Sequence, residues 1–453
     1  MIMASSPILN VLEESQVSPP AATVGNRVLP LTYFDFLWLR QPPIHYLFFY
    51  DLPITQTQFL QTTVPDLKHS LSITLQHFFP FAGRLTVFTA SDQKPEISYV
   101  EGDSVSVTFA ECNLDFKKLT GNQPRDCGMF YHLVPQLGQP DKTSDSTKIP
   151  VFSVQVTLFP NSGISIGMTN HHCLGDASTR FCFLNAWTSI SRSGTEESFL
   201  SNGTLPFYDR VIKNLKLEES YLKYAKVEGF KDEYEPPNLC GPTDKVRATF
   251  ILPRSVLNRL KKLVSIQHPT LAYVSSFTVA CAYMWSCIAS TQEDQLQLFG
   301  FTIDCRARMS PPIPTSYFGN CVGGCVAMDR TTRLTGKDGF VTAAKLIGES
   351  LHKTLTDKDG IVKEIESFGE LFSNGIPTSM IGVAGTPKLK FYDMDFGWGK
   401  PKKIETISID YNGSISMNAC KEKNEDLEIG VCLPITEMES AVRIFEVGLE
   451  EYI

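Results

Sequence analysis

A long polar stretch divides the 453-residue chain into two halves of similar style. Residues 189–247 contain a charge-dense run at 213–235, which is followed by Pro236 and Pro237. On either side of this stretch, short β-branched and aromatic segments alternate with segments whose apolar residues recur at helical spacing. The pattern predicts a mixed α/β (α+β) protein with domains at 1–190 and 246–453, joined by a long crossover loop at 191–245.

The same alternation predicts where the individual elements lie. In the first half we expect strands at 45–50, 96–100, 105–109, 151–159 and 163–170, and helices at 65–79 and 177–190. In the second half we expect strands at 246–252, 296–304, 405–410, 414–419 and 427–433, and helices at 254–264, 273–289, 340–355 and from 437 onward. Gly, Pro, Ser and Asp content predicts mobile loops at 136–150 and 357–377.

Charge and cysteine content exclude several classes of protein. The balance of 41 Lys+Arg against 49 Asp+Glu lacks the basic bias of a nucleic-acid-binding domain. The uncharged stretch 269–292 contains too many hydroxyl side chains for a membrane span and predicts a buried helix. The 12 cysteines form no CxxC pair and are expected to be reduced core residues. The first 30 residues show no signal peptide, so we expect a soluble cytoplasmic protein. We also expect the protein to be a monomer.

One catalytic motif matches by accident. Residues 163–167 fit the GxSxG pattern of serine hydrolases, in which the serine stands on a sharp turn from strand to helix. Here the apolar residues around Ser165 alternate and continue to Asn170, which predicts an extended strand. Ser165 is therefore interpreted as a strand residue and not as a nucleophile.

The segment after this strand is more informative. Residues 170–176 read Asn-His-His-Cys-Leu-Gly-Asp, a short turn before a helical pattern. A histidine at the end of a strand, beside a loop, is well placed to face a cleft. A His-x-x-x-Asp match such as His172 and Asp176 is weak evidence taken alone, and a packed core histidine would give the same pattern.

Two further motifs make the match specific. YFGNC occupies 317–321 and DFGWG occupies 395–399, where aromatic residues beside glycine predict tight turns. Together with HHCLGDAST at 171–179, these residues resemble the signatures of the plant BAHD acyltransferase family. The likeness covers essentially the whole chain and is strongest to the branch that acylates flavonoid glycosides, notably the anthocyanin malonyltransferases of the daisy family.

This resemblance implies two domains related to chloramphenicol acetyltransferase, with a solvent channel at their interface. It implies an acyl-CoA co-substrate and no metal or cofactor, in agreement with the absence of ligand-spaced Cys and His residues. A sugar hydroxyl needs a base to attack a thioester, and an imidazole is suited to this at neutral pH. We therefore assign His172 as general base. Cys173 beside it is the alternative, as a nucleophile.

Asp176 admits two roles: it can orient the imidazole, or it can anchor the loop. The resemblance favours the anchor, because in the family this aspartate binds an arginine of the other half, here Arg306. By the same resemblance, Asp395 stabilises the DFGWG turn near the CoA channel and is not catalytic.

Basic residues suggest where the donor binds. The residues that could bind the CoA phosphates are Lys261, Ser275, Ser276, Lys402 and Lys403. For the lysines, an exposed and solvated surface is an equal alternative.

Arg180 lies one helical turn beyond Asp176 and would bind the carboxylate of a malonyl group, unless it is a surface or Asp-paired arginine. The leading hypothesis is transfer of malonyl from malonyl-CoA to the 6''-hydroxyl of the glucose of an anthocyanidin 3-O-glucoside. The alternatives are a hydroxycinnamoyl or acetyl donor, another phenolic glucoside acceptor, a silent small-molecule binder, or a hydrolase.

Overall fold

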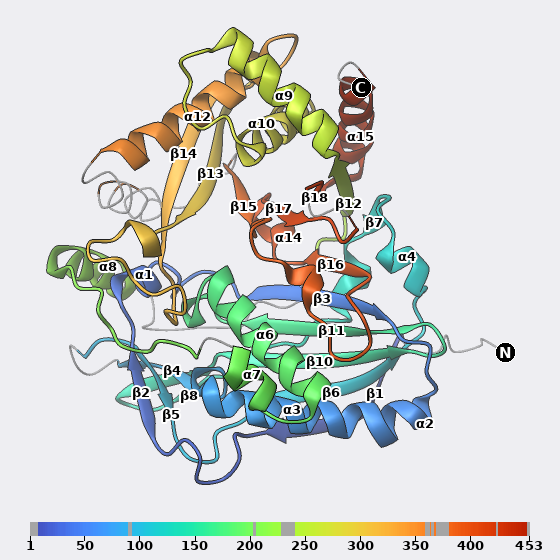
Figure 1. Cartoon of the computed structure of the whole chain (residues 1–453), viewed down its shortest axis with the longest axis vertical. Coiled ribbons are helices and arrows are strands. Elements are labelled where there is room, and N and C mark those ends of the chain that lie inside the picture. The colour runs from blue at the N-terminus through green and yellow to red at the C-terminus, as the bar shows by residue number, and fades with distance from the viewer. Residues whose placement is uncertain are drawn as a thin grey trace.

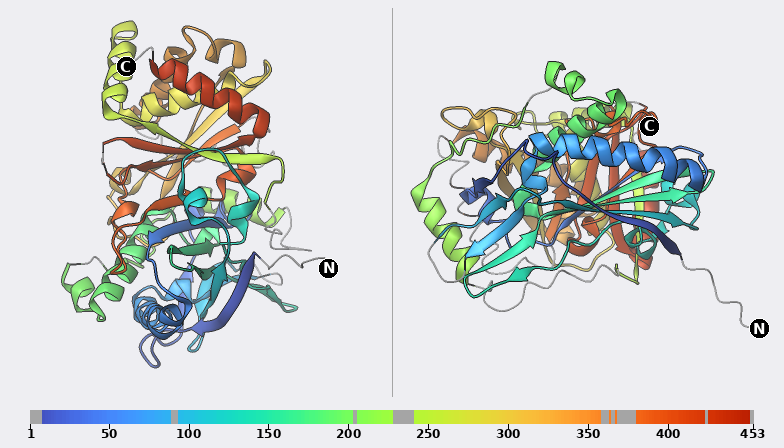
Figure 2. Two further views of the ribbon diagram at one scale, coloured as in Figure 1. Left: turned by 90° about the vertical axis from the view of Figure 1, so that its right-hand side faces the viewer. Right: turned by 90° about the horizontal axis from the view of Figure 1, so that it is seen from below.

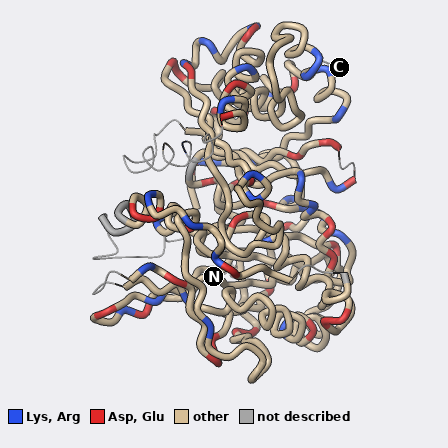
Figure 3. The backbone as a smooth tube through the Cα atoms, turned by 60° about the vertical axis from the view of Figure 1, so that its left-hand side comes forward, with Lys and Arg blue, Asp and Glu red and all other residues tan. Residues whose placement is uncertain are grey.

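Three β-sheets and their covering helices make up the computed structural model, which describes residues 8–88, 93–202, 205–227, 241–357, 363, 367, 380–422 and 425–450. Two of the sheets belong mainly to the first half of the chain, and the third belongs mainly to the second half (Figure 1). Figure 3 shows basic and acidic residues mixed along the chain. No helix within the described ranges is long and apolar enough to cross a membrane.

The six-stranded sheet carries the loop that contains His172. Its strands, in spatial order, are β1 (Leu9–Val17), β6 (Val105–Cys112), β10 (Phe152–Phe159), β11 (Gly163–Asn170), β3 (Ile44–Asp51) and β16 (Lys403–Thr406). Every residue of β10 and β11 is buried, so the small and polar residues that alternate with their apolar residues also lie in the interior. Ser165 lies inside β11 and pairs with Thr157, so the GxSxG match is confirmed as accidental.

Helices α3 (Val64–His77) and α6 (Ala177–Ser193) pack against one another on one face of this sheet (Figure 1). Helix α6 begins at Asp176, whose carboxylate accepts hydrogen bonds from the backbone N–H groups of Ser178 and Thr179. It ends at Gly194, which has a φ of +74°. A good N-cap therefore fixes the helix start directly beside the histidine loop.

A five-stranded sheet completes the first half. Its strands are β2 (Arg27–Pro30), β5 (Glu96–Tyr99), β4 (Arg84–Phe88), β9 (Ser146–Pro150) and β8 (Asp141–Lys142). The prediction of a loop at 136–150 is wrong for its second part, because 141–150 forms an antiparallel hairpin added to β4. The other predicted loop, 357–377, lies almost wholly outside the described residues.

The seven-stranded sheet forms the second half. Its strands are β14 (Val322–Arg330), β13 (Leu296–Asp304), β15 (Met380–Ala384), β17 (Ile415–Ala419), β18 (Leu427–Pro434), β12 (Lys245–Leu252) and β7 (Arg125–Asp126). Its longer helices are α9 (Arg254–Gln267), α10 (Ser276–Ala289), α12 (Gly339–Thr356) and α15 (Ile435–Glu450). Helix α10 is buried along most of its length, so the uncharged stretch is confirmed as a core helix.

Shorter helices connect these elements. They are α1 (Tyr33–Phe36), α2 (Gln56–Gln58), α4 (Phe116–Thr120), α5 (Gly128–Tyr131), α7 (Glu197–Asn202), α8 (Leu215–Val227), α11 (Thr331–Leu334) and α14 (Ile409–Asn412). Helix α8 lies within the predicted crossover segment, in its charge-dense run, and packs against α1 (Figure 2).

Each half of the chain contributes one strand to a sheet of the other half. Strand β16 comes from the second half but pairs with β3, and β7 comes from the first half but pairs with β12. The strand expected at 405–410 is therefore partly wrong, because it ends at Thr406 and 409–412 is the helical turn α14. The predicted domain boundaries at 190 and 246 do not account for this exchange of strands.

Buried charges accompany the exchanged strands. Arg125 on β7 and Arg247 on β12 both bind Glu405 on β16, at 2.7 and 3.1 Å, and Arg247 also binds Asp410 at 2.9 Å. Burial alone would raise the pKa of Glu405, but the neighbouring arginines bring it down to about 2. The strand exchange thus places a charge-balanced network in the interior.

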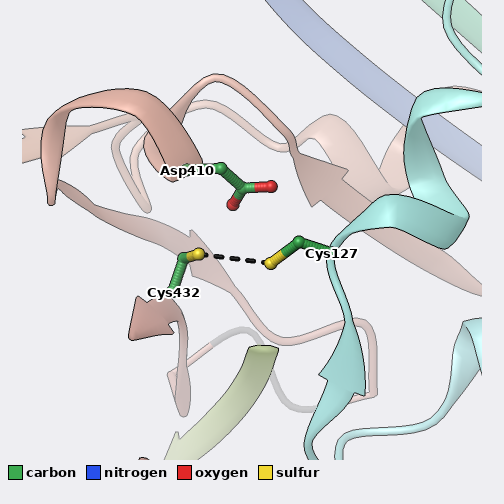
Figure 4. A group of neighbouring side chains, drawn as sticks. All are labelled: Cys127, Asp410 and Cys432. Atoms are coloured by element: carbon green, nitrogen blue, oxygen red, sulfur yellow. Dashed lines mark hydrogen bonds between the residues drawn. The ribbon is translucent and has the colours of Figure 1, made fainter. Parts of the chain in front are cut away.

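Two cysteines meet beside this network. The Sγ atoms of Cys127 and Cys432 lie 3.2 Å apart, next to Asp410 (Figure 4). Both oxygens of Asp410 already accept hydrogen bonds from the Arg247 guanidinium, whose positive charge opposes a metal ion there. All eleven cysteines in the described ranges are free thiols and nine are buried, as expected for reduced core residues.

Replacing Arg247 with Met should destabilise the protein by about 3–5 kcal/mol, because two buried carboxylates lose their shared cation. Urea unfolding measures the change. Arg330→Met is the control: Arg330 forms an ion pair with Asp294, but both side chains are exposed, so the midpoint should hardly move. Equal effects of the two variants would contradict a structural role for the buried network.

Candidate active site

The histidine loop starts where β11 ends. Residues His172–Leu174 form one turn of 3-10 helix between β11 and α6. His171 is fully buried, and its Nδ1 accepts a hydrogen bond from the Cys173 backbone N–H at 3.3 Å. His172 is only partly buried. The turn therefore leaves His172 as the histidine of this pair that has access to a ligand.

The imidazole of His172 stacks on the indole of Trp38. Their ring centroids are 3.8 Å apart and the planes differ by 9°. The Nδ1 atom of His172 is buried with no hydrogen-bond partner in the described part of the chain. Burial, reinforced by the charge of Arg180, lowers the pKa of His172 to about 3. The ring is therefore neutral at pH 7, as a general base must be, and Nε2 is the nitrogen available to substrate.

Cys173 is poorly suited to the alternative role of nucleophile. Its side chain is buried, and burial raises the pKa of its thiol well above the usual value. A thiol becomes a strong nucleophile only when it ionises readily.

Asp176 binds Arg306 and anchors the loop. Arg306 Nη1 donates to Asp176 Oδ2 at 2.7 Å, and Arg306 Nη2 donates to Asp176 Oδ1 at 3.1 Å. The same carboxylate accepts from the backbone N–H of Cys321 at 3.0 Å and from the start of α6. None of its hydrogen bonds among the described residues reaches the His172 imidazole. This geometry agrees with the anchor and not with the orienting role.

The YFGNC turn closes over the histidine loop from the second half. Arg306 Nη2 also donates to the carbonyls of Tyr317 and Gly319. Thr179 Oγ1, on the first turn of α6, donates to the Gly319 carbonyl at 3.0 Å. The Asn320 side chain donates to the backbone carbonyl of His172 at 3.1 Å. Both halves therefore position the loop.

Asp395 holds the DFGWG turn and stands apart from the histidine loop. Its Oδ1 accepts hydrogen bonds from the backbone N–H groups of Gly397 and Gly399, both at 2.8 Å. These glycines have φ values of +101° and +90°, which side chains rarely adopt. The aromatic residues of the turn pack on Tyr50 of β3, so the turn joins the second half to the six-stranded sheet.

Arg180 lines a cavity formed mainly by residues of the first half, with Phe391 contributed by the second half. Its Nη1 donates to the Gly175 carbonyl at 3.1 Å and its Nη2 donates to the Tyr46 hydroxyl at 3.0 Å. The buried Nε has no partner, and no carboxylate within the described ranges forms an ion pair with this arginine. The cavity is otherwise mainly aromatic and aliphatic, with Tyr46 and Asn170 as its other polar members. An Asp-paired arginine, the alternative considered from sequence, is thus not what this structure has.

The predicted CoA-binding residues separate into two groups. Lys261 on α9 donates to the hydroxyl of Ser276 at the start of α10, and the Ser275 hydroxyl caps that helix. Lys402 lies elsewhere, in an exposed ion pair with Asp51.

Lys403 requires a correction. It is buried, and its Nζ binds Glu428 at 2.7 Å and Asn122 at 2.9 Å, so it is not available to a phosphate. The sequence placed Lys402 and Lys403 in one basic run, but successive residues of an extended strand point to opposite faces.

Sequence reasoning missed Asp35, Trp38 and Tyr46, and gave no role to Asn320. The Thr32-x-x-Asp35 spacing is a capping-box signal, and the structure has this capping box at the start of α1. The sequence carries no comparable signal for Trp38, because its contact with His172 joins residues 134 positions apart.

The fold defines the class of the protein. The structure matches that of vinorine synthase with a TM-score of 0.68 over 95% of this chain and 96% of that chain, at 20% identity. The predicted mixed α/β fold, with sheets flanked by helices in both halves of the chain, is thereby confirmed.

Sequence comparison identifies the family. A model described as the Transferase family matches residues 10–447, and the chain belongs to this family, the BAHD acyltransferases that its motifs indicated. The chain is 50% identical over the whole of both sequences to a malonyl-coenzyme A:anthocyanin 3-O-glucoside-6''-O-malonyltransferase of Dahlia pinnata. It is 42% identical, over 90% of this chain and 91% of the relative, to phenolic glucoside malonyltransferase 1 of Nicotiana tabacum.

Three histidines whose pKa values are lowered should make the protein sensitive to mild acid. Burial lowers the pKa of His45 and His171 to about 4, and that of His172 to about 3. Below about pH 6.5 the unfolded chain binds protons that the folded chain does not, so stability falls as pH falls. Each histidine contributes up to about 1.4 kcal/mol per pH unit between its two pKa values.

Thermal melts between pH 8 and pH 5 test this prediction. The melting temperature should be level above about pH 7 and fall below it. His171→Asn should reduce the slope, because one buried imidazole is removed, whereas His69→Asn, at an exposed position of α3, should not. A melting temperature that stays constant down to pH 5 would contradict the assignment.

Proposed function

We propose that the protein transfers the malonyl group of malonyl-CoA to the 6''-hydroxyl of the glucose of an anthocyanidin 3-O-glucoside. The observation that carries this proposal is the 50% identity, over the full length of both chains, to the Dahlia pinnata enzyme that is named for that activity. Relatives also include a phenolic glucoside malonyltransferase, so other phenolic glucosides are the second candidate acceptors. Malonyl-CoA is the co-substrate, and the reaction needs no cofactor because the thioester is already activated.

In the proposed reaction His172 is the general base. Its neutral imidazole takes the proton of the glucose hydroxyl while that oxygen attacks the thioester carbon. Collapse of the tetrahedral adduct breaks the carbon–sulfur bond and releases CoA as a thiolate, which takes the proton back from His172 and leaves the base neutral again. Asp176, Arg306 and Asp395 act by holding loops in place. The buried ion pair of Asp176 with Arg306 supports this reading.

Arg180 supports malonyl as the acyl group. A carboxylate in the cavity could accept hydrogen bonds from its Nε–H and from a remaining N–H of the guanidinium. An apolar donor would leave this cation without an anion. Lys261, Ser275 and Ser276 are the proposed contacts for the CoA phosphates, because a lysine and two hydroxyls lie at the positive end of α10.

The solvent channel between the halves, the cytoplasmic location and the monomeric state remain predictions from the sequence.

Mass analysis of the products tests the function. The protein should add one malonyl group to an anthocyanidin 3-O-glucoside, more efficiently than to simple phenolic glucosides, and release one CoA per product. His172→Ala should lower the rate by about 10²–10⁴-fold. Release of CoA without an acceptor would indicate a hydrolase, and a lack of any turnover would indicate a silent binder.

The variant Arg180→Ala should discriminate between donors. Removing the cation should lower kcat/KM for malonyl-CoA by about 30- to 1000-fold, whereas acetyl-CoA has no carboxylate to lose a partner. The ratio of the two donors cancels general damage to the fold. Arg192→Ala, at an exposed position near the end of α6, is the control and should leave the ratio unchanged. An equal fall for both donors in Arg180→Ala would make Arg180 a structural residue.

A further inference from the structure

We propose that Trp38 and Asn320 are positioning residues that clamp His172, and that the buried carboxylate of Asp35 couples them. This inference rests on the proposed function, in which His172 is the general base. The clamp has one arm from each half of the chain: Trp38 follows α1 in the first half, and Asn320 belongs to the YFGNC turn of the second half.

Trp38 constrains the ring of His172. Parallel planes 9° apart at 3.8 Å mean that the indole covers one face of the imidazole. Turning the imidazole about its Cβ–Cγ bond would break this stack and expose the ring face. The backbone N–H of Trp38 donates to the Asp35 carbonyl at 3.1 Å, which fixes the indole relative to the turn after α1.

Asn320 constrains the backbone of His172. It is fully buried, and its Nδ2 donates both to the His172 carbonyl at 3.1 Å and to Asp35 Oδ1 at 3.1 Å. Its backbone N–H donates to the same Asp35 oxygen at 2.9 Å. The ring and the main chain of His172 are thus held from opposite halves of the molecule.

Asp35 joins the two arms. Its Oδ2 accepts from the backbone N–H and the hydroxyl of Thr32, at 2.9 and 3.0 Å, while Oδ1 serves Asn320. The side chain is fully buried, yet no Lys or Arg in the described ranges forms an ion pair with it. A buried carboxylate held only by neutral donors is costly. This carboxylate lies between Asn320 and the turn that carries Trp38. The link that it makes between these two residues explains why a buried carboxylate without an ion-pair partner is kept here.

The charged and titratable groups near the imidazole determine how the pKa of His172 would respond to a substitution at Trp38 or Asn320. Arg180 on α6 and the preceding residue His171 both disfavour protonation of His172. Asp176 is bound to Arg306, and Asp35 lies behind Asn320. None of these contacts is altered by trimming the indole, so admission of water to the ring is the main expected effect of that change.

Kinetic measurements between pH 5 and pH 8 on Trp38→Leu, Trp38→Phe and Asn320→Ala test the clamp. Trp38→Leu should lower kcat by about tenfold or more with little change in KM, because the base is misplaced while the substrates still bind. Water at the exposed ring should raise the pKa of His172 and bring an acidic limb of kcat/KM into this range. Trp38→Phe should show a smaller effect in the same direction. Asn320→Ala should lower kcat without moving the limb.

Trp398→Leu is the matched control, because it removes a tryptophan that packs on Tyr50 and Phe396 instead of on His172. It should leave the acidic limb where the wild type has it. A wild-type pH profile and kcat in both Trp38 variants would overturn the role of Trp38. In a double-mutant cycle of Trp38→Phe with Asn320→Ala, strictly multiplicative effects would overturn the coupling through Asp35.

A second readout separates this proposal from the proposed function. The rate at which diethylpyrocarbonate modifies His172, followed by mass mapping of the peptide, needs no substrate. Uncovering the ring in Trp38→Leu or Trp38→Phe should increase this rate, and an unchanged rate would overturn the clamp. If the wild type transfers no malonyl group, the proposed function fails while this measurement still decides the placement of the ring.

Discussion

The bidentate pair between Asp176 and Arg306 is the interaction on which the rest of the site depends. Both side chains are buried, and breaking such a pair leaves an uncompensated charge in the interior. Asp176 also caps α6, so the ion pair fixes where that helix begins and hence where Arg180 lies. Arg306 in turn holds the carbonyls of the YFGNC turn, which seats Asn320 against His172.

A second constraint is the exchange of strands between the halves. Strand β16 brings Glu405 and Lys403 between the sheets, where Arg125, Arg247 and Glu428 neutralise them. An ion-paired strand buried in this way resists separation of the halves, since parting them would leave charges in apolar surroundings. The relative position of the histidine loop and the turns of the second half follows from this fixed arrangement.

Most long elements could be predicted because each buries a regular set of side chains. The spacing of Leu67, Leu71 and Leu75 in α3 and the alternating apolar residues of β10 and β11 determine their structure locally. The hairpin at 141–150 was missed because most of the side chains at 141–146 are exposed, so no apolar pattern marks it. The strand expected at 405–410 lies at Lys403–Thr406 instead, because three of its four buried residues are polar and their partners lie far away in sequence.

The sequence by itself determined the family, the histidine loop and the presence of Arg180 one helical turn beyond Asp176. These depend on contiguous residues or on fixed helical spacing, which a linear pattern records. Only the tertiary structure decided that Lys403 is buried, that Arg180 lacks a carboxylate partner among the described residues, and that Trp38 stacks on His172. Each of these is a contact or an absence of contact between distant segments, and its energy depends on burial and distance, which no local pattern of residues contains.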